Sequence, residues 1–289
     1  MTQKYIELNS GHTIPTIGLG VYKTPQNVAK DIVVKALEVG YRHVDSAQAY
    51  QNEHEVCEGI AEWIKQDPAK NKREDVFYTT KIREANHGYE LTKKSIEQSL
   101  KLAKNIGYID LFLVHSPQSN YEKRHGTWMA LQEAVESGLV KSIGVSNYGI
   151  KHLEELLAYS DLKIVPALNQ VELHPWLTRT DLVDFCRSKG IVVEAYSPLT
   201  RGQKIDDAGL KKIAAKYGKT TAQILLNWSL SKGFVTLPKT ITPERLLPNL
   251  QSADFELSVD DVKMLDSWDE YLVTVPEWDP TVYPLDNEK

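Results

Sequence analysis

Four residues that could carry acid–base chemistry follow apolar runs in the first half of the sequence: Asp45, Tyr50, Lys81 and His115. Asp45 closes the run that begins at 41, Lys81 the run from 76 and His115 the run from 111, while Tyr50 follows shortly after Asp45. Ionisable groups at strand ends, repeated roughly every 35 residues, are typical of an enzyme on a barrel rim, where catalytic residues come from different strands.

The four side chains suit proton donation to a substrate oxygen. Tyr50 is the expected donor, but a free phenol has a pKa near ~10, which is high for donation at neutral pH. The ammonium of Lys81, held by Asp45, would lower the pKa of Tyr50, and His115 would hydrogen-bond and orient the substrate oxygen. Any one of them alone could be a satisfied structural polar group. All four at the same end of successive units indicate a catalytic set.

Such a proton donor matches carbonyl reduction, which also needs a source of hydride. The chain has no Rossmann fingerprint, because Gly18-Leu19-Gly20 begins like one but Lys23 stands where the third glycine should be. A nicotinamide must bind by another device. The ends of later strands carry polar and aromatic residues that could stack on the ring or bond its carboxamide: Ser146, Asn147, Gln170 and Tyr196. Tyr196 alone could equally be a core aromatic at the rim.

A candidate phosphate site follows the last expected strand. Lys239 and Thr240 come directly after it, and Arg245 opens the next expected helix. A helix N-terminus flanked by Lys and Arg is a common anion site. The alternative is a solvated basic pair.

Short apolar strands alternate with amphipathic helices along the chain. Strands are expected near 16–20, 41–45, 76–81, 108–114, 140–145, 166–171, 191–195 and 234–237. Helices are expected near 26–39, 53–65, 89–104, 127–137, 150–158, 179–188, 220–232 and 243–250, with extra helices at 206–217 and 259–268. Apolar residues at both odd and even positions are typical of parallel strands that are buried on both faces. The pattern predicts one (β/α)₈ TIM-barrel domain over 1–289, plugged by a β-hairpin at 5–16. The tail from Glu270 is expected to form a loop over the active site, and the alternative is a C-terminus that is simply packed on the barrel.

Composition excludes several classes of protein. The net charge of −5 argues against a non-specific nucleic-acid surface, which needs clustered basic charge. No apolar run approaches the ~20 residues of a membrane helix, and no signal-like segment opens the chain. Two cysteines, Cys57 and Cys186, cannot form a disulfide framework and are expected to be reduced and packed. We expect a cytoplasmic protein without a metal site.

These residues give the sequence a resemblance to the aldo-keto reductase family over almost its whole length. The segments that carry it are 40–47 (GYRHVDSA), Tyr50, Asn52-Glu53, Thr80-Lys81, 108–115 (YIDLFLVH), 144–147 (GVSN), His174-Pro175 and 195–199 (AYSPL). Segment 141–149 (KSIGVSNYG) is most similar to the fungal branch. The resemblance implies a (β/α)₈ barrel, NADPH extended across the rim, and reversible carbonyl reduction by a monomer or homodimer.

The resemblance also implies a role for individual residues. The tetrad would be Asp45, Tyr50, Lys81 and His115, with Tyr50 as the general acid. The nicotinamide would be held by Ser146, Asn147, Gln170 and Tyr196. Ser197 and Leu199 would line the path of the pyrophosphate. The adenosine 2′-phosphate and adenine would be bound by Lys239, Thr240, Arg245 and Asn249.

Departures from the family pattern fall in the expected substrate pocket. Tyr22 and Ser116 stand where the family commonly has Trp, and Arg83 follows the strand that bears Lys81. These three residues, with Trp278 or Tyr283 from the tail, should face the substrate. The alternative for Arg83 is that it points to solvent, on a loop that folds away from the mouth. A roomier, positively charged pocket favours keto esters and vicinal dicarbonyls alongside simple aldehydes, and disfavours uncharged pentoses. Pro248 replaces a Glu or Gln near the expected adenine site.

Two other functions suit a barrel of this kind. A class I aldolase would use Lys81 as a Schiff base, although Tyr50 and the Lys239/Arg245 pair argue against it. A non-catalytic member of the same fold would bind NADPH as a regulatory or interaction subunit. The complete tetrad favours an enzyme over that alternative.

Overall fold

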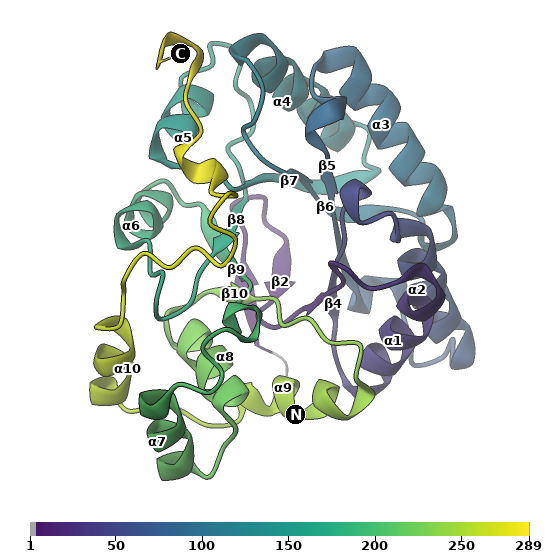
Figure 1. Ribbon diagram of the computed structural model, residues 1–289. Helices are drawn as coiled ribbons and strands as arrows, with labels where there is room; N and C mark the ends of the chain where they lie inside the picture. The colour runs from purple at the N-terminus through teal and green to yellow at the C-terminus, as the bar shows by residue number, and fades with distance from the viewer. Residues whose placement is uncertain (1–3, 289) are drawn as a thin grey trace.

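The computed structural model describes residues 4–288, in which eight parallel strands curl into a barrel (Figure 1). The strands are β3 (Leu19–Gly20), β4 (His43–Asp45), β5 (Phe77–Ile82), β6 (Ile109–Val114), β7 (Val140–Ser146), β8 (Leu168–Glu172), β9 (Val192–Tyr196) and β10 (Val235–Thr236). Each pairs with its neighbour in chain order. Parallel bridges from Ile17 to Thr236 and from Gly20 to Lys239 join the two edges of the sheet. The predicted (β/α)₈ barrel is confirmed.

Helices surround the barrel in the order that the sequence predicts (Figure 1). They are α1 (Gln26–Val39), α2 (Glu53–Gln66), α3 (Tyr89–Leu102), α4 (Tyr121–Glu136), α5 (Ile150–Leu157), α6 (Thr180–Ser188), α8 (Thr221–Ser231) and α9 (Leu246–Leu250). The two extra helices are α7 (Ala208–Tyr217) and α10 (Val259–Asp266). The predicted start of α4 near 127 was wrong, because Asn120 caps the helix earlier by accepting a hydrogen bond from the backbone N–H of Lys123.

The N-terminal hairpin closes the far end of the barrel in Figure 1. Its antiparallel strands are β1 (Tyr5–Glu7) and β2 (Thr13–Pro15). Leu8 and Ile14 pack into a cluster with strand residues that include Leu111 and Leu168. The Asn9 side chain donates to the Pro166 carbonyl, which precedes β8. The hairpin therefore covers the amino ends of the strands and leaves their carboxyl ends open for a site.

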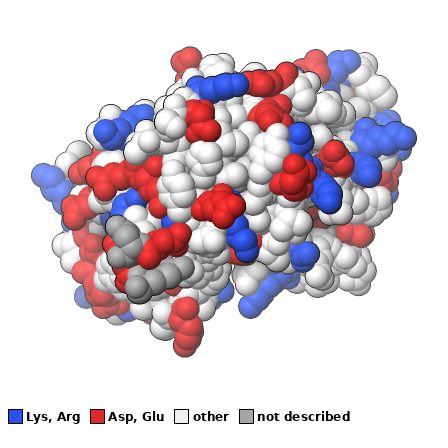
Figure 2. All heavy atoms as spheres, turned by 90° about the horizontal axis from the view of Figure 1, so that it is seen from above, with Lys and Arg blue, Asp and Glu red and all other residues white. Residues whose placement is uncertain are grey.

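The strands are apolar at both odd and even positions because both of their faces are buried. Every residue of β5 is buried, since one face of the strand packs on helices and the other fills the barrel. Cys57 and Cys186 are buried and form no disulfide. Among the described residues, no helix is both long and apolar enough to cross a membrane. On the face that Figure 2 shows, acidic and basic side chains are interspersed.

Gly18 lies where the barrel closes and packs against the interior. A Cβ atom built there would lie 2.6 Å from Nδ1 of His43 and 2.7 Å from Cδ2 of Leu237. At Gly20, two residues along, the nearest atom would be 3.5 Å away, at ordinary contact distance. The Gly-x-Gly of the sequence therefore reflects close packing of His43, not a dinucleotide-binding turn.

We predict opposite effects from one methyl group at these two glycines. Gly18→Ala should destabilise the protein by about 1–3 kcal/mol, because overpacking forces rigid neighbours apart. Gly20→Ala should be neutral or stabilising by up to about 1 kcal/mol, because alanine restricts the unfolded chain. The measurement is the urea unfolding midpoint with an unchanged m-value. Equal midpoints for the two variants would contradict the packing described at Gly18.

Candidate active site

The structure brings the four predicted tetrad residues together at the carboxyl ends of three adjacent strands. Asp45 ends β4, Lys81 lies near the end of β5, and His115 directly follows β6. Tyr50 ends a short 3₁₀ turn, η1 (Gln48–Tyr50), that follows β4. Because parallel strands end on the same side of a barrel, side chains far apart in sequence meet there.

Lys81 is the centre of this cluster. Its side chain is fully buried, and its ammonium lies 2.7 and 2.8 Å from the two carboxylate oxygens of Asp45. It also donates to the Ser46 carbonyl at 2.8 Å and lies 3.4 Å from the Tyr50 hydroxyl. A buried charge is tolerated only when paired and hydrogen-bonded, as Lys81 is. The ion pair therefore fixes where the phenol of Tyr50 can lie.

The phenol of Tyr50 stands between two other rings. Its ring centroid is 5.0 Å from that of Tyr22 and 5.6 Å from that of His115, which it meets edge-on. Burial and, to a smaller extent, the charge of Lys81 lower the pKa of His115 to about 3. His115 is therefore a neutral imidazole at physiological pH, able to donate one N–H and accept at the other nitrogen.

The pKa of Tyr50 differs from the sequence-based expectation. Burial raises it well above the ordinary value, and the negative charge of Asp45 adds to that rise, while Arg201 opposes it. The expected lowering by Lys81 is not found, because both oxygens of Asp45 already neutralise the ammonium. Tyr50 is therefore a neutral phenol that keeps its proton at physiological pH.

Two of the residues predicted to bind the cofactor, one at the nicotinamide and one along the pyrophosphate, lie just past strand ends in an unusual backbone conformation. Asn147 follows β7 with φ of 62°, and Ser197 follows β9 with φ of 49°. Non-glycine residues in this left-handed region are uncommon and concentrate at functional sites. The Asn147 amide donates to the His115 carbonyl and accepts a hydrogen bond from the hydroxyl of Tyr196. Ser146 donates to the backbone carbonyl of Gln170.

The Gln170 side chain points into the barrel interior. Its amide nitrogen donates to Asp45 at 2.9 Å and to Glu194 at 2.7 Å. The sequence analysis did not single out Glu194, a fully buried residue in the middle of β9. The available signal was one acidic residue inside the apolar run 191–195.

The predicted phosphate-binding residues follow β10, near the junction that closes the barrel. Lys239 and Arg245 are exposed, and in the described part of the chain neither forms an ion pair with a carboxylate. Thr240 is buried, and its hydroxyl accepts a hydrogen bond from the Thr242 backbone. Asn249 is buried within α9. Leu199, in the loop after β9, packs partly buried against the core.

The predicted substrate-pocket residues occupy different environments. Tyr22 is 42% exposed beside Tyr50, whereas Arg83 is exposed with no ion pair among the described residues. Ser116 is fully buried and donates its hydroxyl to Glu84. A cation that the sequence analysis missed also acts on the tetrad, since the guanidinium of Arg201 is 5.4 Å from the Tyr22 ring centroid and its charge opposes the rise in the pKa of Tyr50. The sequence could not indicate this position of Arg201, because it depends on a contact between two loops that are far apart in the chain.

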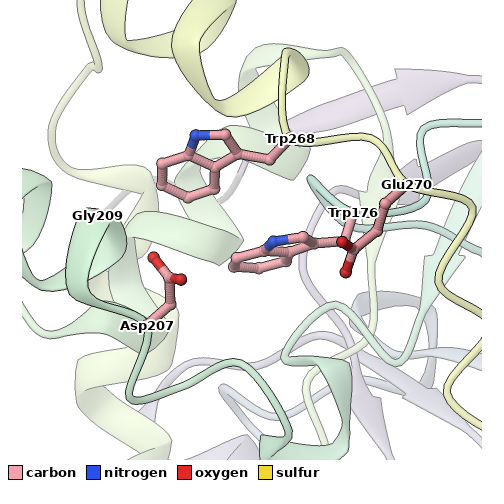
Figure 3. A pocket seen from close by; sticks show the side chains of 5 residues that line it. All are labelled: Trp176, Asp207, Gly209, Trp268 and Glu270. Atoms are coloured by element: carbon pink, nitrogen blue, oxygen red, sulfur yellow. The ribbon is translucent and has the colours of Figure 1, made fainter.

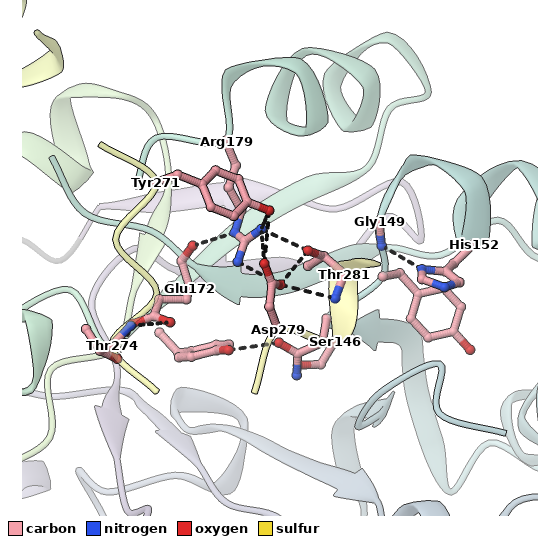
Figure 4. A network of polar contacts seen from close by, with 12 residues as sticks. Ser146, Gly149, His152, Glu172, Arg179, Tyr271, Thr274, Asp279 and Thr281 are labelled. Atoms are coloured by element: carbon pink, nitrogen blue, oxygen red, sulfur yellow. Dashed lines mark hydrogen bonds and ion pairs between the residues drawn. The ribbon is translucent and has the colours of Figure 1, made fainter. Parts of the chain in front are cut away.

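The C-terminal tail crosses the open end of the barrel and is tied down by Arg179 (Figures 1 and 4). Arg179 precedes α6 and pairs with Asp279 at 3.0 Å, and both side chains are almost fully buried. Arg179 also donates to the hydroxyls of Tyr271 and Thr281. The tail packs closely here, because a Cβ atom at Gly149 would meet the Thr281 carbonyl oxygen at 2.0 Å.

Two tail residues were predicted to face the substrate. Trp278 is partly buried within this tied segment, next to Asp279. The backbone carbonyl of Tyr283 accepts a hydrogen bond from His152 on α5. The contact of either side chain with a substrate stays a prediction.

A separate hollow lies between α7 and the start of the tail (Figure 3). The rings of Trp176 and Trp268 lie there with centroids 5.2 Å apart. Glu270 at its edge is already paired with Lys204 at 2.7 Å. None of the residues predicted to act in the site lines this hollow.

Comparison with known proteins identifies the family. A model described as "Aldo/keto reductase family" matches residues 16–270. The chain belongs to the aldo/keto reductase family. It is 45% identical to "Uncharacterized oxidoreductase YJR096W" of Saccharomyces cerevisiae, over 98% of this chain and 100% of that protein. It is 41% identical to "Glyoxal reductase" of Bacillus subtilis, over 91% of each. The chain is therefore an aldo-keto reductase with relatives in fungi and bacteria.

Solved structures of the family agree with the fold. The apo form of Gox0644 superposes with a TM-score of 0.87 at 34% identity, covering 99% of this chain and 100% of that one. MGS-M4, an aldo-keto reductase from a deep-sea metagenome, gives a TM-score of 0.86 at 38% identity, covering 93% and 96%. Both similarities span the barrel and the elements that carry the tetrad.

Proposed function

We propose that this protein reduces aldehydes and ketones to alcohols with NADPH, using Tyr50 as the general acid. The observation that carries the proposal is a neutral phenol 3.4 Å from a buried ammonium that is itself paired with Asp45. Membership in an oxidoreductase family supports the reaction class. The burial of the cluster supports the role of Tyr50, because a buried donor transfers its proton to the substrate and not to water.

In this proposal each tetrad residue has a separate task. The carbonyl oxygen of the substrate would accept hydrogen bonds from Tyr50 and from the neutral imidazole of His115. As negative charge develops on that oxygen, the O–H bond of Tyr50 breaks and the proton moves to the oxygen, giving the alcohol. An alkoxide is a stronger base than a phenolate, so a raised pKa of Tyr50 still permits this transfer. Lys81, whose ammonium lies 3.4 Å from the hydroxyl of Tyr50, would hold the phenol in position.

Residues at the ends of β7, β8 and β9 fit a nicotinamide. Oε1 of Gln170 accepts no hydrogen bond from the described residues, while its amide nitrogen is engaged by two carboxyl groups. It could therefore accept an N–H from the carboxamide, with Ser146 and Asn147 beside it and the Tyr196 ring against the ring of the cofactor. A bound NADPH supplies the hydride. Ser197 and Leu199 would lie along the pyrophosphate.

The cation pair after β10 supports the choice of NADPH over NADH. Lys239 and Arg245 are exposed and unpaired within the described chain, which suits a 2′-phosphate. Thr240 would join them, and Asn249 would contact the adenine. Burial lowers the pKa of Lys239, and a bound phosphate would oppose that effect.

The proposed substrates are small carbonyl compounds that include vicinal dicarbonyls and keto esters. A relative at 41% identity is named glyoxal reductase, which supports the dicarbonyl class. The cations Arg83 and Arg201 lie near the mouth and would favour substrates with a carboxylate or ester oxygen. The cytoplasmic location and the monomeric or dimeric state stay predictions.

The structure gives less support to the alternatives. A class I aldolase needs a lysine amine free to attack a carbonyl, but the ammonium of Lys81 is fully buried and engaged by Asp45 and Ser46. A non-catalytic NADPH-binding subunit would not require the buried ion pair beside Tyr50. NADPH consumption with a dicarbonyl substrate separates that alternative from the reductase.

The first test removes the proposed acid. Tyr50→Phe should keep the fold and NADPH binding but lose turnover by roughly 10²–10⁴-fold, the usual size of general acid catalysis. The measurement is single-turnover NADPH oxidation, which excludes a limit set by product release. Tyr41→Phe is the matched control, since Tyr41 is a buried tyrosine whose hydroxyl bonds the distant Leu246 carbonyl. Near wild-type turnover in Tyr50→Phe would show that another group supplies the proton.

The second test concerns the cofactor. Arg245→Ala should weaken NADPH binding by about 1.5–3 kcal/mol, the loss of a charge-assisted contact, and leave NADH binding almost unchanged. The two dissociation constants can be measured by quenching of tryptophan fluorescence. Arg187→Ala, at an exposed arginine on α6 that pairs with Asp184 one turn earlier and donates to the Lys232 carbonyl, is the control. An equal loss for both cofactors would place Arg245 away from the 2′-phosphate.

A further inference from the structure

Glu194 gives the barrel interior a second carboxyl group beside one ammonium. It is fully buried on β9, next to the tetrad but outside it. The ammonium of Lys81 is bound to both oxygens of Asp45, so Glu194 has no cation of its own. An unpaired carboxylate in a dry interior is costly, and a neutral acid is the cheaper form.

Gln170 connects the two carboxyl groups. Its amide nitrogen donates one hydrogen to Asp45 and the other to Glu194, across separations of 125 and 24 residues in sequence. Only the NH₂ end of an amide can satisfy two acceptors at once. Glu194 thereby fixes which way round the Gln170 amide lies and leaves Oε1 as its acceptor.

His43 shows where a proton on Glu194 would be held. Oε1 of Glu194 lies 3.8 Å from Nδ1 of His43, and within the described chain neither atom has a hydrogen-bond partner. The other ring nitrogen, Nε2, lies 3.1 Å from the hydroxyl of Thr79, and the backbone of Pro15 also hydrogen-bonds the ring. If the neutral ring of His43 carries its hydrogen on Nε2, then Nδ1 is an acceptor. One proton on Glu194 can then satisfy both Nδ1 of His43 and Oε1 of Glu194.

Burial and the nearest negative charge outweigh the opposing groups and favour a proton on Glu194. The titratable groups that face it are His43 and Asp45 on β4, Lys81 on β5, and Tyr50 on η1. Burial and, to a smaller extent, the negative charge of Asp45 raise the pKa of Glu194 to about 8, against smaller opposite effects of Gln170 and Lys81. Burial also lowers the pKa of His43 to about 3, so the ring is neutral.

We propose that Glu194 is a positioning residue of the reductase. It holds one proton against His43, so that Asp45 remains the only anion beside Lys81 and the Gln170 amide keeps its acceptor oxygen for the carboxamide of the cofactor. This inference rests on the function proposed above. Loss of the Glu194 proton would add a second anion to the cluster, raise the pKa of Tyr50 further and weaken Tyr50 as a donor.

The proton can be observed without turnover, by infrared difference spectroscopy of the cofactor-free protein during a pH titration. Wild-type protein should show a carboxylic acid band that disappears with a midpoint near about 8. The band should be missing in Glu194→Gln and in the neutral variant Glu194→Met, which serves if the first does not fold. Asp45→Asn should keep the band with a lower midpoint, because Asp45 raises the pKa of Glu194.

A second buried acid makes the variants necessary. Burial also raises the pKa of Glu53, which accepts a hydrogen bond from Thr80. Glu53→Gln is therefore the matched control, and it should leave the Glu194 band in place. A band that survives in both Glu194 variants would put the proton elsewhere and overturn the proposal.

The kinetic measurement is the pH dependence of kcat/KM for carbonyl reduction, in particular its decrease on the alkaline side. Wild-type kcat/KM should fall about tenfold between about pH 7 and pH 9, because one ionisation removes the competent form. Glu194→Gln, whose amide can bond both Gln170 and His43 but cannot ionise, should fall less than about twofold over that range. If kcat/KM of Glu194→Gln decreased with pH as much as that of the wild type, the proposed role of the proton would be overturned. Absence of NADPH oxidation with any carbonyl would instead contradict the proposed reductase.

Discussion

The site depends on the burial of one ammonium and two carboxyl groups inside the barrel. Lys81 and Asp45 form an ion pair that is almost fully removed from water. Such a pair is stable only when every remaining donor and acceptor is satisfied, and here Ser46, Tyr50 and Gln170 supply those bonds. Each partner comes from a different strand end or turn, so the barrel must be closed before the pair is complete.

The same burial decides the protonation of the groups around the pair. It keeps His43 and His115 neutral and holds the proton on Tyr50, because charge is disfavoured in the dry interior. A neutral imidazole and a protonated phenol can both donate to a carbonyl oxygen. In the proposed reaction, the electrostatics that stabilise the fold would also prepare the site for reduction.

The sequence predicted the barrel and the tetrad because both leave local signals. Strands buried on two faces read as apolar runs, and Asp45, Lys81 and His115 interrupt those runs at their ends. The contacts that set protonation leave no such signal. Gln170 donates a hydrogen bond to Asp45, which lies 125 residues away in the sequence. Arg201, in the loop after β9, contacts Tyr22, which follows β3 on the opposite side of the junction that closes the barrel. The prediction that the pKa of Tyr50 is lowered was wrong. The sequence identifies the charged groups near the phenol but does not show how deeply the phenol is buried.

The most direct test of this account is the titration of the Tyr50 phenol in the cofactor-free protein. Tyrosine labelled with ¹³C at Cζ reports the loss of the phenolic proton by NMR, and the spectrum of Tyr50→Phe assigns the signal. The account predicts that the Tyr50 signal stays that of a neutral phenol up to and beyond the ordinary pKa of 10.0. A signal that shifts to the phenolate form near neutral pH would contradict it, because Lys81 would then dominate over burial.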